Sequence, residues 1–434
     1  MNAVLNPAQR ALQARAAQAG LLRFITAGSV DDGKSTLIGR LLYDARGILA
    51  DQLTALSSAR NKRVVEGEID FSFLTDGLEA EREQGITIDV AYRYFSTLNR
   101  KFIIADCPGH EQYTRNMVTG ASTADAAVIL VDAARCEGGR LLMQTRRHTA
   151  LARLLGIRHL LFAINKMDLV GYDQQRFDQI VASCRKLLSG LGGHQKAHFV
   201  PLSALRGDNV VERSAQMSWY GGPPLLALLE SLELESFEAK SLRLPVQLVM
   251  RWGGHTAEDN RAYAGRIEAG SIGPGESVAV FPSKQTAQIE RIVLGGIAVD
   301  RGHAGDSVMV YLDRDLDVSR GDVLVEAEAV PAPSRRLQAR LAWLDDDAFV
   351  PGRRYRLRQV TRESQVKLQV REQLNLQTLE YEPADVLSAN DIGTVDVMAA
   401  QALLPDRFDD SPRTGSFILM DESSNRTVAA GMVL

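Results

Sequence analysis

The feature that most constrains the fold of this chain is an octapeptide near its start, Gly28-Ser29-Val30-Asp31-Asp32-Gly33-Lys34-Ser35, which fits the pattern G-x-x-x-x-G-K-[ST]. An apolar run, Leu22–Ala27, precedes it, and a helical pattern, Thr36–Tyr43, follows it. In such a loop the glycines let backbone N–H groups turn inward around phosphates at the start of a helix. We therefore expect the residues from Gly28 to Thr36 to bind a nucleotide, with Lys34 on the β- and γ-phosphates and the Ser35 hydroxyl on Mg²⁺.

The first half of the chain alternates short apolar runs with helical stretches. The expected strands are Leu22–Ala27, Phe102–Ala105, Ala126–Asp132, His159–Ile164 and His198–Pro201, and the helical pattern Leu225–Leu234 closes this region. Such alternation predicts a parallel α/β sheet, whose ligands lie at the carboxyl ends of the strands.

The pattern changes after about Ser241, where short alternating runs separated by glycines predict antiparallel barrels. The expected strands are Leu244–Met250, Ser277–Phe281, Ile289–Leu294, Ser307–Leu312, and then Leu337–Trp343, Arg354–Leu357, Gln365–Val370, Gly393–Met398 and Phe417–Met420. The proline-containing segment Val330–Ser334 interrupts this pattern and predicts a linker or boundary between domains. We expect an N-terminal arm (1–20), an α/β P-loop domain (21–238) and two small antiparallel β-barrel domains (239–330 and 334–434).

A second motif, Asp106-Cys107-Pro108-Gly109-His110, follows the expected strand Phe102–Ala105. A carboxylate at Asp106 can hold the Mg²⁺ shell through water, and the Gly109 N–H can contact a γ-phosphate because only glycine lets the backbone come so close. His110 beside that phosphate can act electrostatically or orient a water molecule, or it can simply cap or pack.

A third motif, Asn165-Lys166-Met167-Asp168, follows the strand His159–Ile164. The Asp168 carboxylate can accept hydrogen bonds from the N1–H and 2-amino groups of guanine, which adenine cannot offer. We expect Asn165 to bridge the base and the P-loop, and the Lys166 stem to cover the ring. Ser203-Ala204-Leu205 follows another strand and can present N–H groups to the guanine 6-oxo group. Together the motifs favour GTP over ATP.

Between the first two motifs lies Arg82-Glu83-Gln84-Gly85-Ile86-Thr87-Ile88-Asp89. A threonine hydroxyl at Thr87 can complete the Mg²⁺ shell while a γ-phosphate is present, and it can release the loop after hydrolysis. From spacing alone, Thr87 is a plausible choice and no more.

Composition restricts the classes of binding partner and the cellular compartment that we expect for this chain. Fifty Lys and Arg against 54 Asp and Glu leave a formal charge of −4, which argues against a nucleic-acid partner. Three scattered cysteines, Cys107, Cys136 and Cys184, predict a reduced, cytoplasmic protein without a disulfide framework or zinc site. No apolar run reaches the roughly 18–20 residues that span a bilayer, so no membrane is expected. The basic stretch Arg353–Arg358 is expected to be one charged face of a strand.

Taken together, GSVDDGKS, REQGITID, DCPGH, NKMD and SAL resemble the translational GTPase family that includes elongation factor Tu. Longer strings are similar to the large GTPase subunits of bacterial sulfate adenylyltransferases: LLYDARGILADQL, DFSFLTDGLEAEREQGITIDVAYRYF, GHEQYTRNMVTGASTADAAVILVDA, QTRRH, LLGIRHLLFAINKMDLV, SWYGGPPLLALLE, YAGRIEAGSIGPGE, DVSRGDVLV, NDIGTVDV and SSNRTVAAGMVL. The resemblance covers roughly residues 20–434.

The resemblance implies a GTPase domain followed by two β-barrels. It further implies that the chain hydrolyses GTP, while a separate small catalytic subunit, similar to ATP pyrophosphatases, makes adenosine 5′-phosphosulfate and pyrophosphate from ATP and sulfate. GTP hydrolysis then drives that uphill adenylyl transfer in sulfate assimilation. By resemblance, Thr87 is the switch residue and His110 positions the attacking water, so that with Lys34 these are the expected catalytic residues.

Two departures from the family pattern stand out. The segment 135–143, Arg135 to Met143, is longer than usual, and no second P-loop follows residue 205, so a fused adenylylsulfate kinase is not expected. Two other classes share the nucleotide motifs: an elongation-factor-like protein that binds tRNA, and a regulatory GTPase whose barrels only recruit proteins. The charge of the last domain and the family-specific strings oppose the first alternative.

Overall fold

The computed structural model describes residues 20–45, 89–192, 196–234, 241–252 and 260–434. The chain divides into two units, one of residues 1–234 with 376–380 and one of residues 235–375 with 381–434. The expected N-terminal arm, apart from Gly20, and the expected boundary at residues 238–239 lie outside the described residues. The ranges given above for the domains therefore remain a proposal.

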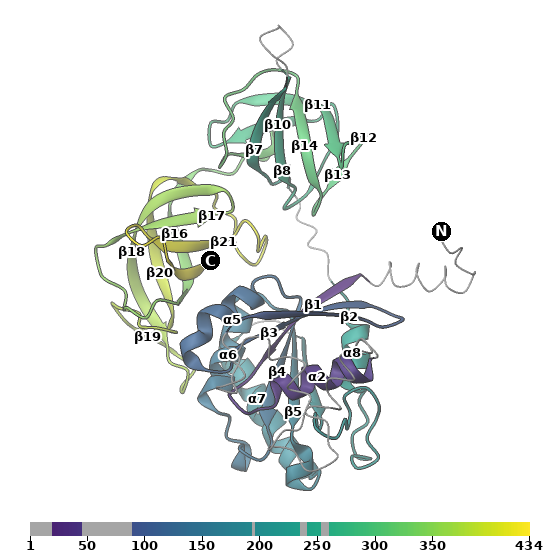
Figure 1. Ribbon diagram of the computed structural model, residues 1–434. Coiled ribbons are helices and arrows are strands. Elements are labelled where there is room, and N and C mark those ends of the chain that lie inside the picture. Colours follow the sequence, from purple (N-terminus) through teal and green to yellow (C-terminus); the bar gives the residue numbers. More distant parts are fainter. Residues whose placement is uncertain (1–19, 46–88, 193–195, 235–240, 253–259) are drawn as a thin grey trace, which may run out of the picture. The chain divides into compact units, whose positions relative to one another are not determined.

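The first unit is built on a six-stranded sheet in the order β2-β3-β1-β4-β5-β6 (Figure 1). The strands are β1 (Leu21–Ala27), β2 (Ala91–Ser96), β3 (Lys101–Asp106), β4 (Ala126–Asp132), β5 (His159–Asn165) and β6 (Lys196–Pro201). All pairs are parallel except β2–β3. The five expected strands are confirmed, whereas the prediction missed the antiparallel edge strand β2. The reason is physical, because Phe95 is the only fully buried residue of β2.

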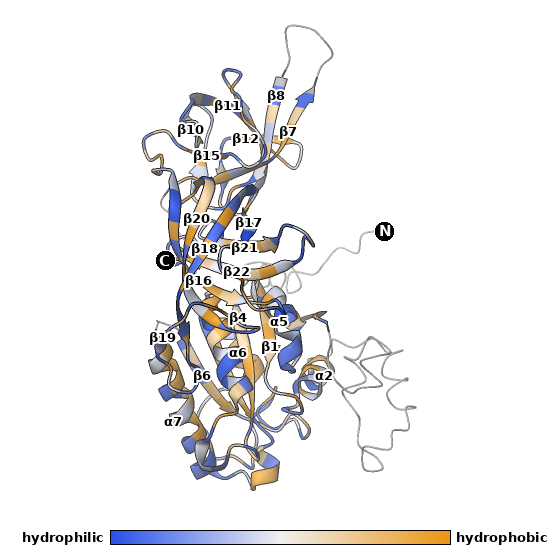
Figure 2. Ribbon diagram, turned by 90° about the vertical axis from the view of Figure 1, so that its left-hand side faces the viewer, coloured by the Kyte–Doolittle hydropathy of each residue, from blue (hydrophilic) through white to orange (hydrophobic). Residues whose placement is uncertain are grey.

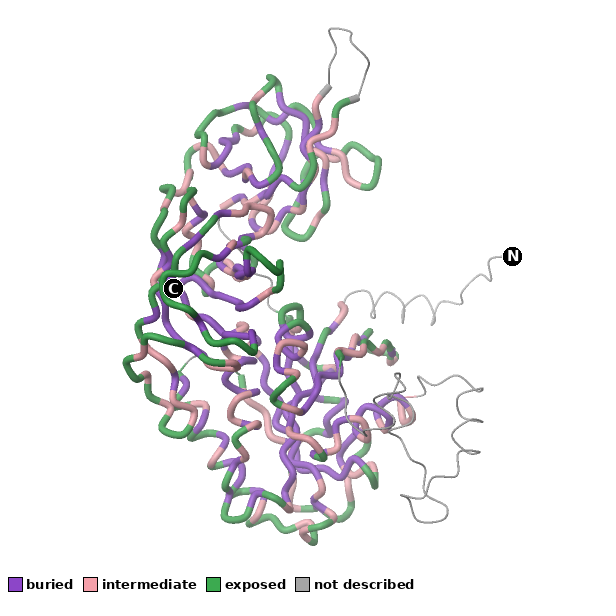
Figure 3. Tube along the Cα trace, turned by 60° about the vertical axis from the view of Figure 1, so that its left-hand side comes forward, coloured by how far each residue is buried: buried purple, intermediate pink, exposed green. Residues whose placement is uncertain are grey.

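Helices cover both faces of this sheet. They are α2 (Lys34–Asp44), α5 (Thr114–Ala121), α6 (Met143–Leu154), α7 (Gln174–Leu191) and α8 (Leu225–Ser231), with the 3₁₀ turns η2 (Glu111–Tyr113), η3 (Glu137–Gly139) and η4 (Met167–Val170). The leucines of α2 and α8 share one apolar cluster with side chains of β1, β3 and β4. Figure 2 shows apolar residues concentrated in the strands, and Figure 3 shows that these strands are buried. This rigid core holds the strand ends, and hence the loops that follow them.

The second unit contains two closed antiparallel barrels of six strands each, in the orders β10-β15-β7-β8-β14-β11 and β17-β21-β22-β16-β20-β18. The first uses β7 (Leu244–Trp252), β8 (Asn260–Arg266), β10 (Ser277–Phe281), β11 (Thr286–Leu294), β14 (Ser307–Leu312) and β15 (Val323–Glu326). The second uses β16 (Ser334–Trp343), β17 (Arg354–Gln359), β18 (Arg362–Leu374), β20 (Ile392–Leu403), β21 (Ser416–Asp421) and β22 (Thr427–Val433). Short strands β9 (Ser271–Ile272), β12 (Ile297–Val299), β13 (Gly302–His303) and β19 (Tyr381–Pro383) are appended. The predicted fold class, a P-loop α/β domain and two barrels, is confirmed.

The basic stretch in β17 is one face of a strand, as expected. Tyr355 and Leu357 point into the barrel, while Arg356 and Arg358 alternate with them and pair with Glu363 on β18. In the described ranges no helix is long and apolar enough to cross a membrane. All three cysteines are buried free thiols.

Candidate functional site

The P-loop leaves the sheet at the carboxyl end of β1 and enters α2 through Gly33. Gly33 has a φ of +91°, and a Cβ there would lie 2.5 Å from the Asn165 Nδ2 atom, so both conformation and space require glycine. The Lys34 ammonium group is buried within the loop and donates to the carbonyls of Gly28 (3.2 Å) and Ser29 (2.9 Å). Burial lowers the pKa of Lys34, and the nearby carboxylates of Asp106 and Asp32 oppose that shift.

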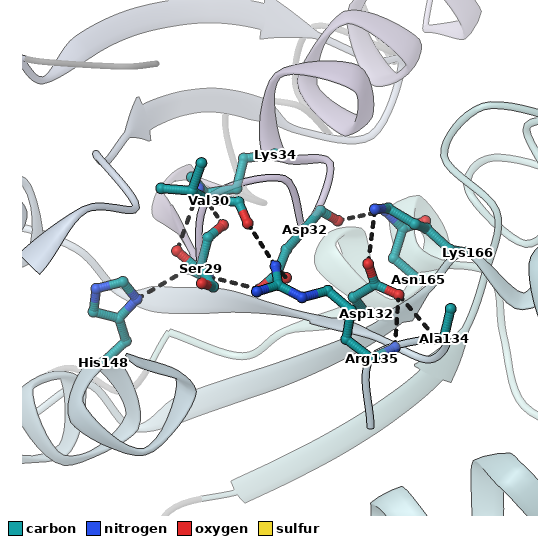
Figure 4. Close-up of polar contacts among 11 residues, drawn as sticks. Ser29, Val30, Asp32, Lys34, Asp132, Ala134, Arg135, His148, Asn165 and Lys166 are labelled. Atoms are coloured by element: carbon teal, nitrogen blue, oxygen red, sulfur yellow. Dashed lines mark hydrogen bonds and ion pairs between the residues drawn. The ribbon is translucent and has the colours of Figure 1, made fainter. Parts of the chain in front are cut away.

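Asp32 stabilises the loop from within. Its side chain is fully buried, and Oδ2 accepts the Ser29 N–H at 2.6 Å. Burial raises the pKa of Asp32 to about 6, against the opposing influence of Lys34 and Arg135. The Arg135 guanidinium lies 3.8 Å from Asp32 Oδ1 and donates to the Val30 carbonyl at 2.9 Å (Figure 4). The loop is therefore bound by a cation from outside its own motif.

The second motif lies directly against the P-loop. Thr26 on β1 donates its hydroxyl to Asp106 Oδ1 at 2.8 Å, and Asp106 is buried at the end of β3. A Cβ on Gly109 would lie 2.9 Å from the Gly28 carbonyl oxygen and would collide with the Lys34 ammonium group. The backbone at Gly109 thus packs directly against Gly28 and Lys34, and its contact with a γ-phosphate stays a prediction.

His110 sits at the start of η2, where its Nδ1 accepts the Gln112 N–H at 3.3 Å. Its ring centroid is 6.1 Å from that of Tyr113. The capping alternative is therefore observed in this structure, and the water-positioning role of His110 stays a prediction. Thr87 lies outside the described residues.

Asn165 joins three motifs. Its Nδ2 donates to the Asp32 carbonyl at 2.8 Å, and its Oδ1 accepts the Ala204 N–H at 2.9 Å. Lys166 adopts a left-handed conformation, with φ of 61°, and its ammonium group pairs with Asp132 at 2.7 Å. Asp168 follows as a half-buried residue of η4. The third motif, the P-loop and the Ser203–Leu205 loop therefore converge at one edge of the sheet.

The carbonyls of the Ser203–Leu205 loop are also bound. Arg40 on α2 donates to the carbonyls of Ala204 (3.3 Å) and Leu205 (2.5 Å), and the Ser203 hydroxyl accepts the Arg206 N–H at 3.2 Å. Two of the three N–H groups of the loop are bonded as well, that of Ser203 to the Asp208 carbonyl at 3.2 Å and that of Ala204 to Asn165, so the expected contact with a guanine 6-oxo group stays a prediction.

The donor set suits Mg²⁺ held together with phosphates. Ser35 offers a hydroxyl in the first turn of α2, and Asp106 offers a carboxylate at the end of β3. Among the described residues no group of three His, Cys, Asp or Glu side chains could hold a metal by itself. A hard cation here would therefore complete its shell with phosphate oxygens and water, as Mg²⁺ does.

Five side chains that contact the predicted motifs were not among the predicted residues: Thr26, Arg40, Asp132, Arg135 and His148. Asp132 ends a buried parallel strand, so the rule that ligands meet carboxyl strand ends could have identified it. His148 on α6 accepts the Gly28 N–H at 3.1 Å across 120 residues, and no spacing signals such a contact. The long segment 135–143 packs on α7, where Arg176 donates to the Cys136 carbonyl at 3.0 Å.

Comparison with known proteins agrees with this geometry. Residues 20–236 match the family described as elongation factor Tu GTP binding domain, and residues 336–434 match the GTP-eEF1A C-terminal domain-like family.

Full-length relatives match 95% of the chain. It is 47% identical to sulfate adenylyltransferase subunit 1 of Rhizobium meliloti (strain 1021) over 81% of that protein. It is 45% identical to sulfate adenylyltransferase subunit 1 of Salmonella paratyphi C over 85% of that protein. It is also 46% identical to the bifunctional enzyme NodQ of Rhizobium sp. (strain N33), of whose length it spans 63%, just under two thirds.

Proposed function

Because this chain belongs to the sulfate adenylyltransferase subunit 1 family, we propose that it is the GTP-hydrolysing subunit of a sulfate adenylyltransferase. In this role, GTP hydrolysis on the chain drives formation of adenosine 5′-phosphosulfate and pyrophosphate from ATP and sulfate. The adenylyl transfer itself occurs on a separate small catalytic subunit similar to ATP pyrophosphatases. The compartment is the cytoplasm, which the three free thiols support.

The observation that carries the GTP assignment is the bridge made by Asn165. One buried side chain ties the P-loop to the Ser203–Leu205 loop and orients the turn that ends in Asp168. A nucleotide whose phosphates lie in the P-loop would thus have its base at the Asp168 carboxylate. The match of residues 20–236 to a GTP-binding domain supports the same base.

Each residue has a role in this proposal. The Lys34 ammonium group neutralises charge on the β- and γ-phosphates, and the Gly109 N–H contacts the γ-phosphate. Ser35, Asp106 and Thr87 would hold Mg²⁺, which would supply positive charge against the phosphate oxygens in the transition state. His110 orients the attacking water, a role for which its Nε2 remains while Nδ1 accepts the Gln112 N–H.

The partner assignment is tested by affinity purification of the full chain from lysate of the source organism, identifying bound protein and RNA. We expect a smaller ATP-pyrophosphatase-like subunit and no stoichiometric tRNA. The complex should release pyrophosphate from ATP and sulfate only when GTP is present, whereas the isolated chain should hydrolyse GTP slowly and make no adenosine phosphosulfate. Stoichiometric tRNA, or product formed by the isolated chain without GTP, would overturn the proposal.

The base assignment is tested with Asp168→Asn. An amide at this position donates to the 2-oxo group of xanthine and no longer accepts from the guanine 2-amino group, so we expect preference to shift from GTP to XTP. Asp173→Asn is a matched control, because Asp173 caps α7 through the N–H groups of Gln175 and Arg176, and asparagine caps equally well. Unchanged GTP preference in Asp168→Asn would exclude Asp168 as the base-reading residue.

A further inference from the structure

The P-loop departs from the sheet at Gly28. β1 pairs with β3 as far as Thr26 and with β4 as far as Ala27. Gly28 is therefore the first residue beyond both ladders, and it is buried. Its N–H cannot reach water, so it needs an acceptor from elsewhere in the domain.

That acceptor is His148. Its imidazole comes from α6, its side chain is fully buried, and its Nδ1 lies 3.1 Å from the Gly28 nitrogen (Figure 4). Because Nδ1 accepts, the proton of the neutral ring is on Nε2, and the Gln144 side chain, whose amide nitrogen is placed 3.2 Å away, must turn its oxygen to that N–H. Burial, together with the cations Lys34 and Arg147, lowers the pKa of His148 to about 3. The ring is thus a neutral acceptor throughout the physiological range.

The next peptide group, that of the Gly28 carbonyl, is bound by Lys34. The Gly28 carbonyl accepts from the Lys34 ammonium group at 3.2 Å, so the two peptides that flank the Gly28 Cα are bound separately. Gly28 has a φ of +154°, and a Cβ there would lie 3.0 Å from the Leu130 carbonyl oxygen. Glycine is required at this turn, and glycine by itself restrains its backbone least of all residues. The imidazole of His148, which lies outside the loop, therefore fixes the peptide orientation that Gly28 leaves free.

We propose that His148 is a positioning residue of the nucleotide site: by accepting the Gly28 N–H it fixes the direction in which the P-loop leaves β1, and hence the place of Lys34. This inference rests on the proposed GTP site and adds to it a residue outside the nucleotide-binding motifs. It differs from a packing role, because it depends on one acceptor atom rather than on the volume of the ring.

Two substitutions of His148, made in the full chain, distinguish the loss of the acceptor atom from a change in side-chain volume. Asparagine places its Oδ1 near the position of the imidazole Nδ1 but leaves a cavity, whereas leucine fills the space and has no acceptor. We expect His148→Leu to weaken the binding of both GTP and GDP about ten-fold or more, since it leaves a buried N–H unpaired. We expect His148→Asn to remain within about three-fold of wild type, because the bond is kept.

His159 provides the matched control. Like His148, it is buried and bonds the backbone through a ring nitrogen, here to the Glu233 carbonyl at 3.0 Å. It differs in position, because it begins β5, at the end of the strand away from the nucleotide motifs. His159→Leu should lower the midpoint of thermal unfolding without changing nucleotide affinity. Affinity is measured by titration with fluorescent GDP and GTP analogues and is corrected for the folded fraction by circular dichroism.

The outcomes are distinct. If His148→Leu binds both nucleotides as tightly as wild type, or if His148→Asn loses as much affinity as His148→Leu, the positioning role is refuted. If the wild-type chain itself binds no guanine nucleotide, the proposed function fails instead. A loss confined to His148→Leu, with the other two variants near wild type, supports the inference.

Discussion

Replacing Asn165 with alanine tests the architecture of the site most directly. The substitution removes the bonds to the Asp32 carbonyl (2.8 Å) and the Ala204 N–H (2.9 Å), and both groups stay buried without a partner. An unpaired buried polar group costs about 1–3 kcal/mol, so the loss of two bonds should lower the free energy of unfolding of the first domain by about 2–6 kcal/mol. Nucleotide affinity should fall as well, because the two loops are no longer tied together.

Asn209 offers a matched comparison. It is equally buried, donates to the Pro201 carbonyl at 2.9 Å and accepts the Ser214 N–H at 2.8 Å, yet it belongs to none of the nucleotide motifs. Its φ of +55° adds about 1–2 kcal/mol of strain to an alanine, so Asn209→Ala should destabilise the domain at least as much as Asn165→Ala.

The assay is urea unfolding with and without GDP and Mg²⁺. A ligand at 100 times its dissociation constant adds about 2.7 kcal/mol to the stability of a protein that binds it. Wild type and Asn209→Ala should gain this increment, and Asn165→Ala should gain almost none at the same concentration. If Asn165→Ala keeps the full increment, or loses less than about 1 kcal/mol without nucleotide, the bridge is not what organises the site.

Two further substitutions probe the P-loop. Burial raises the pKa of Asp32 to about 6 from 3.8, so the contribution of Asp32 to stability is complete below about pH 4 and is lost as the pH rises through 6. The free energy of unfolding, measured with urea, should therefore fall by up to about 3 kcal/mol between pH 4 and 7. Asp32→Asn keeps an acceptor for the Ser29 N–H and should flatten this fall. A methyl group in Gly109→Ala would meet the Gly28 carbonyl oxygen at 2.9 Å and displace the Lys34 ammonium group, so single-turnover GTP hydrolysis should slow at least about ten-fold and GDP affinity should fall by a smaller factor; equal losses in both would contradict a role of Gly109 at the γ-phosphate.

Two kinds of strand could be predicted: strands buried on both faces, and barrel strands with a regular alternation of buried and exposed residues, such as β18. Every residue of β4 and of β5 is buried, so each reads as an uninterrupted apolar run with clear ends. The edge strand β2 alternates exposed tyrosines with a single buried Phe95, which leaves no such run. β22 was missed for another reason, because its buried positions include Ala429, Ala430 and Gly431, small residues that carry little apolar signal.

The same contrast holds in the site. Residues that contact phosphates through the backbone form short motifs, because consecutive N–H groups and glycines must lie within one turn of chain. The octapeptide from Gly28 to Ser35 is therefore visible in the sequence alone. Contacts such as that of His148 with Gly28 join distant segments through one side chain, and nothing in the spacing of a single sequence encodes them.

The restraints on the two phosphate-contacting segments are unequal. The P-loop is held by buried or charged bonds from Asn165, His148 and Arg135, each on a different element. By contrast, the contact between η2 and α6 is an ion pair of Arg147 with Glu111, at 3.1 Å, in which Glu111 is 63% exposed. Exposed ion pairs contribute at most about 1 kcal/mol, far less than the bonds around the P-loop.

This inequality has a consequence for control of the reaction. A preorganised P-loop binds phosphates without first having to be ordered, so nucleotide affinity should depend little on any partner. In the proposed mechanism the segment with Gly109 and His110 acts only on the γ-phosphate and the attacking water. We therefore expect a partner subunit that stimulates this chain to raise the rate of hydrolysis rather than the affinity for GTP. Glu111→Ala, which removes the ion pair but keeps the bond of Arg147 to Gln144, should change that stimulation while leaving GDP binding unaltered, and a loss of GDP affinity in this variant would refute the division between the two segments.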